Sequence, residues 1–436
     1  MKRFTVSTFF GRYLPWLFAA LPLLGLICLL VQYQVDVPYQ DEWSYLSLID
    51  KSFLGELSLR DFWTQLNEHR PVFPRLIIVP LARLTHWNIT YELALNVILA
   101  LGSFLILSWY VLKSNPFADP SKTRWFIPII SLIVFSIQQL DSWLWGGATT
   151  PFFLSVCSAI FGIVLLSAAS FRWNIFWIAV FLGIISNYSH SAGFVYWPVG
   201  SLILFWKGKT QKSKASLAWF LIFFFSVLLY SYHYAKPAHH HLLLYGLRHP
   251  GELVASFFLY LGSIFGWKLS FPAGVLGFIG FSGMSLFLFF SEKVNKDRIL
   301  GFIALGFFSL GNALITGIAR VGFHPLATLE PRYITISYPF WISILILSQI
   351  TSHVLKVKSI FLVSSVLIVV LISGRSVASI VPFKEFSQRL REGRDELFIL
   401  KNEKVLKYLH PEIDKIKTGA EILKRRRLSL FRTQLN

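Results

Sequence analysis

The stretch "LPWLFAALPLLGLICLLVQYQVDVPYQDEW" (Leu14–Trp43) joins an uncharged run of twenty residues to a short segment with three carboxylates. A transmembrane helix needs about 20 predominantly apolar residues. The run therefore predicts a first membrane span over 14–33. The carboxylates that follow are expected at the rim of the membrane, where Asp41 and Glu42 stand side by side.

The rest of the chain repeats this apolar pattern. Hydrophobic residues make up 55% of the 436 and charged residues only 14%, whereas soluble domains carry about 25% charged residues. We expect an all-α, polytopic integral membrane protein with about eleven transmembrane helices and interfacial helices in its loops. The expected spans are 14–33, 91–112, 125–140, 150–170, 173–187, 193–206, 216–234, 272–290, 299–318, 333–353 and 359–380.

The basic residues are distributed unevenly over the loops. With the N-terminus in the cytoplasm, the inside loops hold 16 basic and three acidic residues, and the outside segments before the tail hold ten basic and eleven acidic ones. Cytoplasmic loops are enriched in Lys and Arg, so the loop 34–90 is expected outside the cytoplasm of an inner (plasma) membrane. Because the net charge of +19 is split among short loops, it does not indicate a nucleic-acid partner.

Three further segments complete the expected organisation. Residues 70–87 hold three prolines and three arginines, too many for a lipid-exposed span, so we expect an amphipathic helix in the interface. Residues 252–268 are expected to form an outside half-helix. A transmembrane domain over 1–381 would precede a polar helical tail, 382–436, placed outside by the number of spans. The basic run "KRRR" (Lys424–Arg427) suits lipid headgroups.

Acidic side chains in the first outside loop are the candidate catalytic groups. A carboxylate at a membrane rim can act as a general base, ligate a metal or solvate a helix end, and these alternatives apply to Asp41. Adjacent carboxylates point in different directions, so at most one of Asp41 and Glu42 is expected to act directly. Glu68 is a second candidate acid or base.

Other polar residues of the outside loops are candidates for binding a substrate. Arg320 and Arg332 border two expected spans, and guanidinium groups can bind a phosphate in a bidentate manner; the alternative is snorkelling to lipid headgroups. The remaining candidates accompany them in the same set of loops and are His69, Arg70, Asp141, His190, His324 and Tyr333.

The sequence predicts no metal site. His239–His241 are three consecutive histidines, and consecutive side chains cannot all converge on one ion from a regular backbone. Cys28 and Cys157 lie inside apolar runs and are expected to be inert. The cofactor requirement stays unknown.

Five motifs together resemble the GT-C superfamily of membrane glycosyltransferases, whose bacterial relatives are mostly uncharacterised. The motifs are "DEW" (41–43), "NEHRPVFPRLI" (67–77), "QQLDSWLWG" (138–146), "SHSAGFVYWPVG" (189–200) and "ARVGFHPLATLEPRY" (319–333). The resemblance implies a catalytic base in the first outside loop. It also implies a polyprenyl-phosphate-linked sugar donor and transfer on the outer face of the membrane.

The resemblance implies a single displacement with inversion. Asp41 would remove a proton from a hydroxyl of a lipid or glycan acceptor, and arginines would offset the charge of the leaving lipid phosphate. Three other classes stay open: a transporter or flippase for a lipid-linked saccharide, a polysaccharide polymerase or ligase, and a non-catalytic scaffold. Transporters tend to place polar groups near mid-membrane, whereas those of this chain cluster at one rim.

Overall fold

The computed structural model describes residues 6–117, 119–168, 170–207, 212–237, 244–323 and 326–433. Within these ranges the chain is all-helical, and the one β-bridge joins Leu66 to His69. The first half of the chain forms α1 (Val6–Tyr33), α2 (Leu46–Leu54), α3 (Leu59–Trp63), α4 (Val72–Thr85), α5 (Ile89–Ser114), α6 (Pro120–Arg124), α7 (Phe126–Val134), α8 (Leu140–Leu144), α9 (Gly146–Ala168), α10 (Trp173–Asn187) and α11 (Tyr196–Lys207).

The second half continues the bundle and adds the tail. Its helices are α12 (Lys212–Ser231), α13 (Leu244–Arg248), α14 (Pro250–Leu261), α15 (Ser270–Phe290), α16 (Lys296–Arg320), α17 (Ile334–Leu355), α18 (Lys358–Ala378), α19 (Ile380–Glu396), α20 (Glu403–Leu406) and α21 (Ile413–Arg426). Short 3₁₀ turns between them are η1 (Gln40–Ser44), η2 (Ile137–Gln139), η3 (Ser191–Val195), η4 (Ser263–Phe265), η5 (Ala327–Leu329), η6 (Pro331–Tyr333) and η7 (Ser429–Thr433).

Nine helical segments of the described residues are long and apolar enough to cross a membrane. This confirms a multi-pass membrane protein. The other two expected spans, 173–187 and 193–206, correspond to α10 and α11. These helices have 15 and 12 residues and are too short to be counted among the nine. At 1.5 Å per residue α10 is only about 22 Å long, less than the roughly 30 Å hydrocarbon core.

The polar turn between α10 and α11 lies inside the protein. The turn between them, from Tyr188 to His190, is buried. Non-helical backbone is tolerated at membrane depth only where protein or a wet cavity surrounds it. The two helices therefore stop short of one rim of the bundle and carry a polar turn into its interior.

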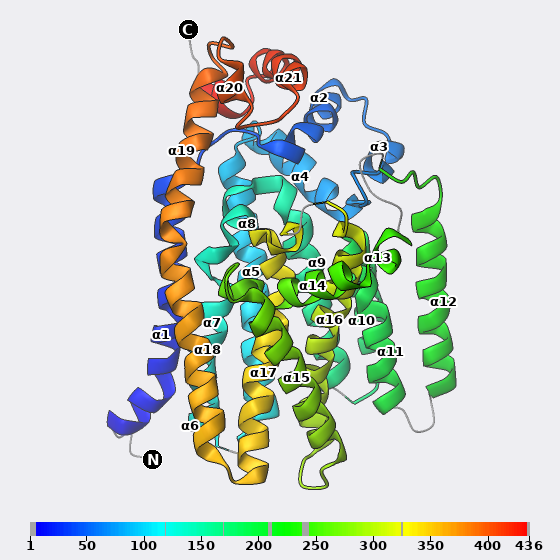
Figure 1. Cartoon of the computed structure of the whole chain (residues 1–436). Helices are drawn as coiled ribbons and strands as arrows, with labels where there is room; N and C mark the ends of the chain where they lie inside the picture. Colours follow the sequence, from blue (N-terminus) through cyan, green and yellow to red (C-terminus); the bar gives the residue numbers. More distant parts are fainter. Residues whose placement is uncertain are drawn as a thin grey trace.

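The bundle has two distinct ends (Figure 1). The loop end carries η1 and the helices α2, α3 and α4 of the first loop, together with α20 and α21 of the tail (Figure 1). The far end is where α5, α9, α11 and α15 finish and α16 starts, as the side chains that meet there show (Figure 1). The N-terminus of α1 lies at the far end (Figure 1).

The expected interfacial helix over 70–87 is α4. It buries Ile78, Val79 and Ala82 on one face, while Leu76 and Leu84 are exposed on the other. The proline inside it, Pro80, does not end the helix. The half-helix expected over 252–268 is α14, which ends at Leu261.

The tail packs on the first loop. Arg426 Nε donates to Asp50 Oδ1 at 2.6 Å, and Arg432 lies 3.1 Å from Asp36. The backbone amide of Ser429 donates to the carbonyl of His86 at 2.9 Å. The tail and the first loop are therefore on the same side of the bundle.

Candidate functional site

A polar cavity of about 210 Å³ opens at the loop end of the bundle. Four distant parts of the chain contribute to it: the first loop, the start of α9, the turn before η3, and the loop between α16 and α17. Its lining consists of Asp41, Leu66, Asn67, Glu68, His69, Pro71, Trp145, Ala148, Pro151, Phe152, His190, Arg320 and Arg332.

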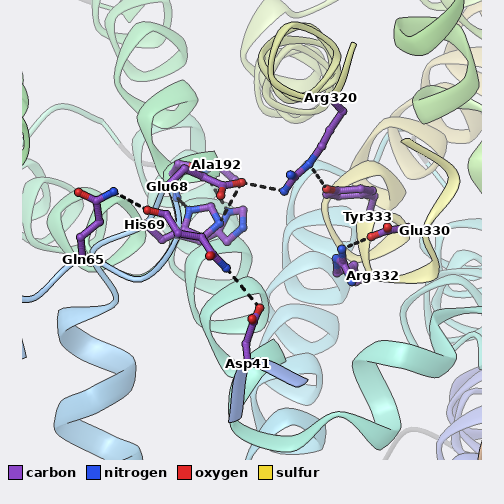
Figure 2. Close-up of polar contacts among 12 residues, drawn as sticks. Asp41, Gln65, Glu68, His69, Ala192, Arg320, Glu330, Arg332 and Tyr333 are labelled. Atoms are coloured by element: carbon purple, nitrogen blue, oxygen red, sulfur yellow. Dashed lines mark hydrogen bonds and ion pairs between the residues drawn. The ribbon is translucent and has the colours of Figure 1, made fainter. Parts of the chain in front are cut away.

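Asp41 reaches the cavity from η1. The preceding residue, Gln40, has a φ of 48°, and its amide donates to the carbonyl of Leu409 in the tail at 2.7 Å. Asn67 Nδ2 lies 3.5 Å from Asp41 Oδ2 (Figure 2). Among the described residues the Asp41 carboxylate makes no hydrogen bond besides this long one. Its other oxygen is therefore left for a ligand.

Glu42 points the other way, into the protein. Its two carboxylate oxygens accept from the amides of Gly147, at 2.8 Å, and Tyr39, at 2.7 Å. Burial, and after it the neighbouring carboxylate of Glu92, raises the pKa of Glu42 well above its usual value. Glu42 therefore holds η1 against the first turn of α9 and does not line the cavity.

Glu92, a buried carboxylate beside Glu42, was not among the residues predicted from the sequence. It lies in the first turn of α5, and its Oε1 accepts from Trp87 Nε1 at 2.9 Å. A Cβ at Gly146 would stand 2.8 Å from Glu42 Oε1 and 2.9 Å from Glu92 Oε2. Glycine at this position lets two carboxylates approach the start of α9. A lone glutamate at the edge of an apolar run was the available signal.

Glu68 and His69 form the opposite wall from a tight turn. Asn67 has a φ of 49°, and Leu66 and His69 exchange backbone hydrogen bonds of 2.9 Å. Glu68 Oε1 accepts from Arg320 Nη2 at 2.7 Å and lies 3.6 Å from His69 Nε2. Glu68 is therefore the counter-ion of Arg320 in this arrangement.

The rings of His69 and His190 lie against each other, with centroids 4.0 Å apart. Each ring uses Nδ1 as an acceptor, from the amides of Ser191 at 3.3 Å and Ala192 at 3.1 Å respectively. Burial lowers the pKa of His69. Burial, and after it the neighbouring His69 and Arg320, lower the pKa of His190 well below its usual value. Both rings are neutral near pH 7 and carry their proton on Nε2.

The two arginines enter from the other side of the cavity. Arg320 Nε donates to the hydroxyl of Tyr333 at 2.9 Å, while its Nη2 reaches Glu68 (Figure 2). Arg332 forms an ion pair with Glu330 and lies over the ring of Trp145, 5.2 Å from its centroid. These contacts hold the guanidinium groups of Arg320 and Arg332 in position. Each group has five N–H donors, so each keeps donors for a ligand.

Arg70 does not face the cavity. Its Nε, Nη1 and Nη2 donate to the carbonyls of Tyr230, Trp63 and Tyr232 at 2.7, 2.9 and 2.5 Å. The side chain is 3% exposed and ties the first loop to the end of α12. Each of its three nitrogens donates to a backbone carbonyl, and Arg70 is not part of the cavity lining, so it is not placed to bind a phosphate there.

The remaining predicted site residues fall outside the lining. Asp141, in α8, is absent from it, although its charge acts on Arg332. Tyr333 contributes through Arg320 and is 3% exposed. His324 and His239–His241 lie outside the described residues. The described residues contain no group of three His, Cys, Asp or Glu side chains arranged to hold a metal ion.

The arrangement combines a weakly bonded carboxylate with two fixed guanidinium groups across a small cavity. It can accept a proton from a hydroxyl at Asp41 and bind an anion at Arg320 and Arg332. Trp145, whose indole Nε1 donates to the carbonyl of Tyr39 at 2.9 Å, supplies an aromatic wall. No protein-family model, no curated protein and no solved structure matches the chain.

Proposed function

We propose that the protein is a membrane glycosyltransferase. It would move a sugar from a polyprenyl-phosphate-linked donor to a hydroxyl of a lipid or glycan acceptor at the loop end of the bundle, outside the cytoplasm. One observation carries the proposal: Asp41, Arg320 and Arg332, from sequence positions far apart, line the same cavity.

Asp41 suits the role of general base. Glu68 is paired with Arg320 and Glu42 is buried against α9. Asp41, among the described residues, has a single long contact, with Asn67. Asp41 would take the proton of the acceptor hydroxyl as its oxygen attacks the anomeric carbon. A general base contributes roughly 10²–10⁴-fold to the rate.

Arg320 and Arg332 suit the leaving group. The bond between the anomeric carbon and the phosphate oxygen breaks, and the lipid phosphate leaves with the electron pair. Fixed cationic donors stabilise charge that develops in the transition state. Since the acceptor oxygen attacks from the side opposite the phosphate, a single displacement inverts the anomeric centre.

The first prediction is that Asp41→Asn lowers transfer by roughly 10²–10⁴-fold and leaves the fold intact. Membranes with the wild-type chain or the variant would be incubated with radiolabelled polyprenyl-phosphate sugars, and the labelled product counted. Asn keeps the shape of the side chain but cannot accept the proton.

Glu56→Gln is the matched control, because Glu56 is an exposed carboxylate of the same loop. It should transfer at the wild-type rate. Transfer by Asp41→Asn at more than about a tenth of the wild-type rate would remove Asp41 as the base. A wild-type chain that binds but never consumes any labelled donor would favour a transporter instead.

A further inference from the structure

A second polar cavity, of about 460 Å³, lies at the far end of the bundle. The ends of α5, α9 and α11 and the start of α16 form it. Its charged lining residues are Lys113, Lys207, Arg298 and Asp297, which give three positive charges and one negative charge. It shares no residue with the cavity at Asp41.

An apolar groove of about 580 Å³ adjoins this cavity between α11, α15 and α16. Trp206 lines both spaces, so they lie next to each other at that side chain. The groove is open to the outside of the bundle, where Phe205, Leu286 and Phe290 are 75%, 60% and 76% exposed. It is apolar and lies beside a cationic chamber.

The cations of the chamber are available to an anion in different degrees. Lys207 Nζ donates to the carbonyl of Ser167, and Lys113 Nζ lies 4.7 Å from the centroid of the Trp109 ring. Arg298 is exposed and forms no ion pair within the described ranges. An amphiphile with an anionic head and a hydrocarbon tail matches this combination of surfaces.

We propose that this composite site binds one anionic phospholipid of the surrounding bilayer. Its phosphate would lie against Lys113 and Arg298, and one acyl chain would occupy the groove beside Trp206. Basic pockets between transmembrane helices bind acidic headgroups. The described residues of the loops at the far end include 13 basic and three acidic ones, which favours the leaflet where anionic lipids concentrate.

The site is independent of the proposed transferase activity. It stands at the opposite end of the helices, and neither Asp41 nor the arginines of the first cavity take part in it. A bound lipid here would join α5, α9, α11 and α16, which otherwise meet at this end across a hollow. We therefore expect binding to raise the thermal stability of the bundle.

The experiment uses the full chain purified in detergent. Native mass spectrometry counts retained lipid, and a thermal-shift assay follows stability, during titration with phosphatidylglycerol or phosphatidylcholine of the same acyl chains. The wild type should retain one phosphatidylglycerol and show a higher apparent melting temperature with it. Phosphatidylcholine should bind at least about tenfold more weakly, a difference of about 1.4 kcal/mol.

Two variants and one control separate the parts of the site. Lys113→Gln with Arg298→Gln removes headgroup charge, and Ser282→Trp fills the groove, which Ser282 lines. Each should weaken phosphatidylglycerol binding about tenfold or more. Lys293→Gln with Lys356→Gln removes two exposed charges of the same end outside both spaces and should bind like the wild type.

Three results would overturn the proposal. The first is equal binding of the two phospholipids by the wild type. The second is equal loss in the Lys293/Lys356 control, which would indicate a diffuse charge effect. The third is tighter binding of a polyprenyl phosphate than of phosphatidylglycerol, lost in Ser282→Trp, which would make this a carrier-lipid site. Elution of each variant as a single species in size-exclusion chromatography establishes that it has folded.

Discussion

At the scale of single residues, Asp41 and Glu42 have opposite environments although they are adjacent. Glu42 is 1% exposed and accepts two backbone hydrogen bonds, while Asp41 faces the cavity. In a 3₁₀ turn, successive side chains point in directions about a third of a turn apart. The sequence predicted that at most one of the two would act directly, and the packing of α9 on η1 selects Asp41 for the cavity.

The histidine pair makes a prediction about acid stability. In the unfolded chain His190 titrates near 6.5, whereas burial lowers its pKa in the folded chain. Below pH 6.5 the unfolded state therefore binds more protons, and the free energy of unfolding falls as the pH falls from 6.5 towards the lowered pKa of the folded state. Each unit of pKa lowering corresponds to about 1.4 kcal/mol.

The measurement is the apparent melting temperature in detergent at pH 7.5 and 5.5. His190→Asn should lose less stability on acidification than the wild type, because Asn can still accept from the amide of Ala192 but does not titrate. His86→Asn is the control, since His86 is exposed and has a φ of 52°, which Asn tolerates. The raised pKa of Glu42 acts with the opposite sign and is common to all three chains. Equal acid sensitivity of His190→Asn and the wild type would contradict this assignment.

At the scale of elements, the tail supports the turn that carries Asp41. The ring of Trp43, two residues after Asp41, packs on Gly419 of α21, where an added Cβ would stand 2.6 Å from Cζ3. The amide of Gln40 is bound by Leu409, and Lys415 Nζ donates to Ser44 at 3.2 Å. The tail is therefore expected to position the turn that carries Asp41 from outside the bundle.

We predict that Gly419→Ala lowers both stability and transfer. Overpacking of this kind costs typically 1–3 kcal/mol, and displacement of Trp43 would shift Asp41. Gly374→Ala in α18 is the matched control, because a Cβ there meets nothing within 4 Å. Melting temperature and transfer rate would be measured for both. A Gly419→Ala chain that behaves like Gly374→Ala would show that α21 does not position η1.

At the scale of the whole molecule, the loop end and the far end differ in charge and in the cavities they hold. The first loop holds seven acidic residues and the tail holds eight, whereas the described loops of the far end are mostly basic. Since the tail packs on the first loop, both should be accessible from one side of the membrane. The proposed transfer reaction requires that this be the outer side.

Labelling of single cysteines tests this orientation. In a chain whose Cys28 and Cys157 are replaced by Ala, cysteine would be introduced at the exposed positions Glu56, Lys401, Lys293 or Lys356. A membrane-impermeant maleimide added to intact spheroplasts should modify the cysteines at 56 and 401 but not those at 293 and 356. Labelling of 401 together with 293 would contradict the packing of the tail. Labelling of 293 and 356 alone would place the first cavity in the cytoplasm.

Several features of the fold and site could be predicted from sequence. Nine spans follow from long apolar runs, and α4 follows from its prolines and arginines. The bounds expected for α10, 173–187, are those of the structure, and α11 was expected over 193–206. The sequence did not predict that these two helices are too short to count among the membrane spans, because their apolar runs resemble those of the other spans. The sequence also suggested Arg70 as a phosphate ligand. In the structure its guanidinium group donates to the carbonyls of Tyr230 and Tyr232, which are 160 and 162 residues away along the chain.

The sequence by itself determined that this chain crosses a membrane many times and which ends of its helices are basic. Those properties are sums over local hydrophobicity and charge, which no distant contact can alter. Only the tertiary structure decided which polar side chains share a cavity. That depends on contacts between remote segments, such as Glu68 with Arg320, and on whether neighbouring backbone groups already satisfy each side chain, as they do for Glu42 and Arg70 but not for Asp41.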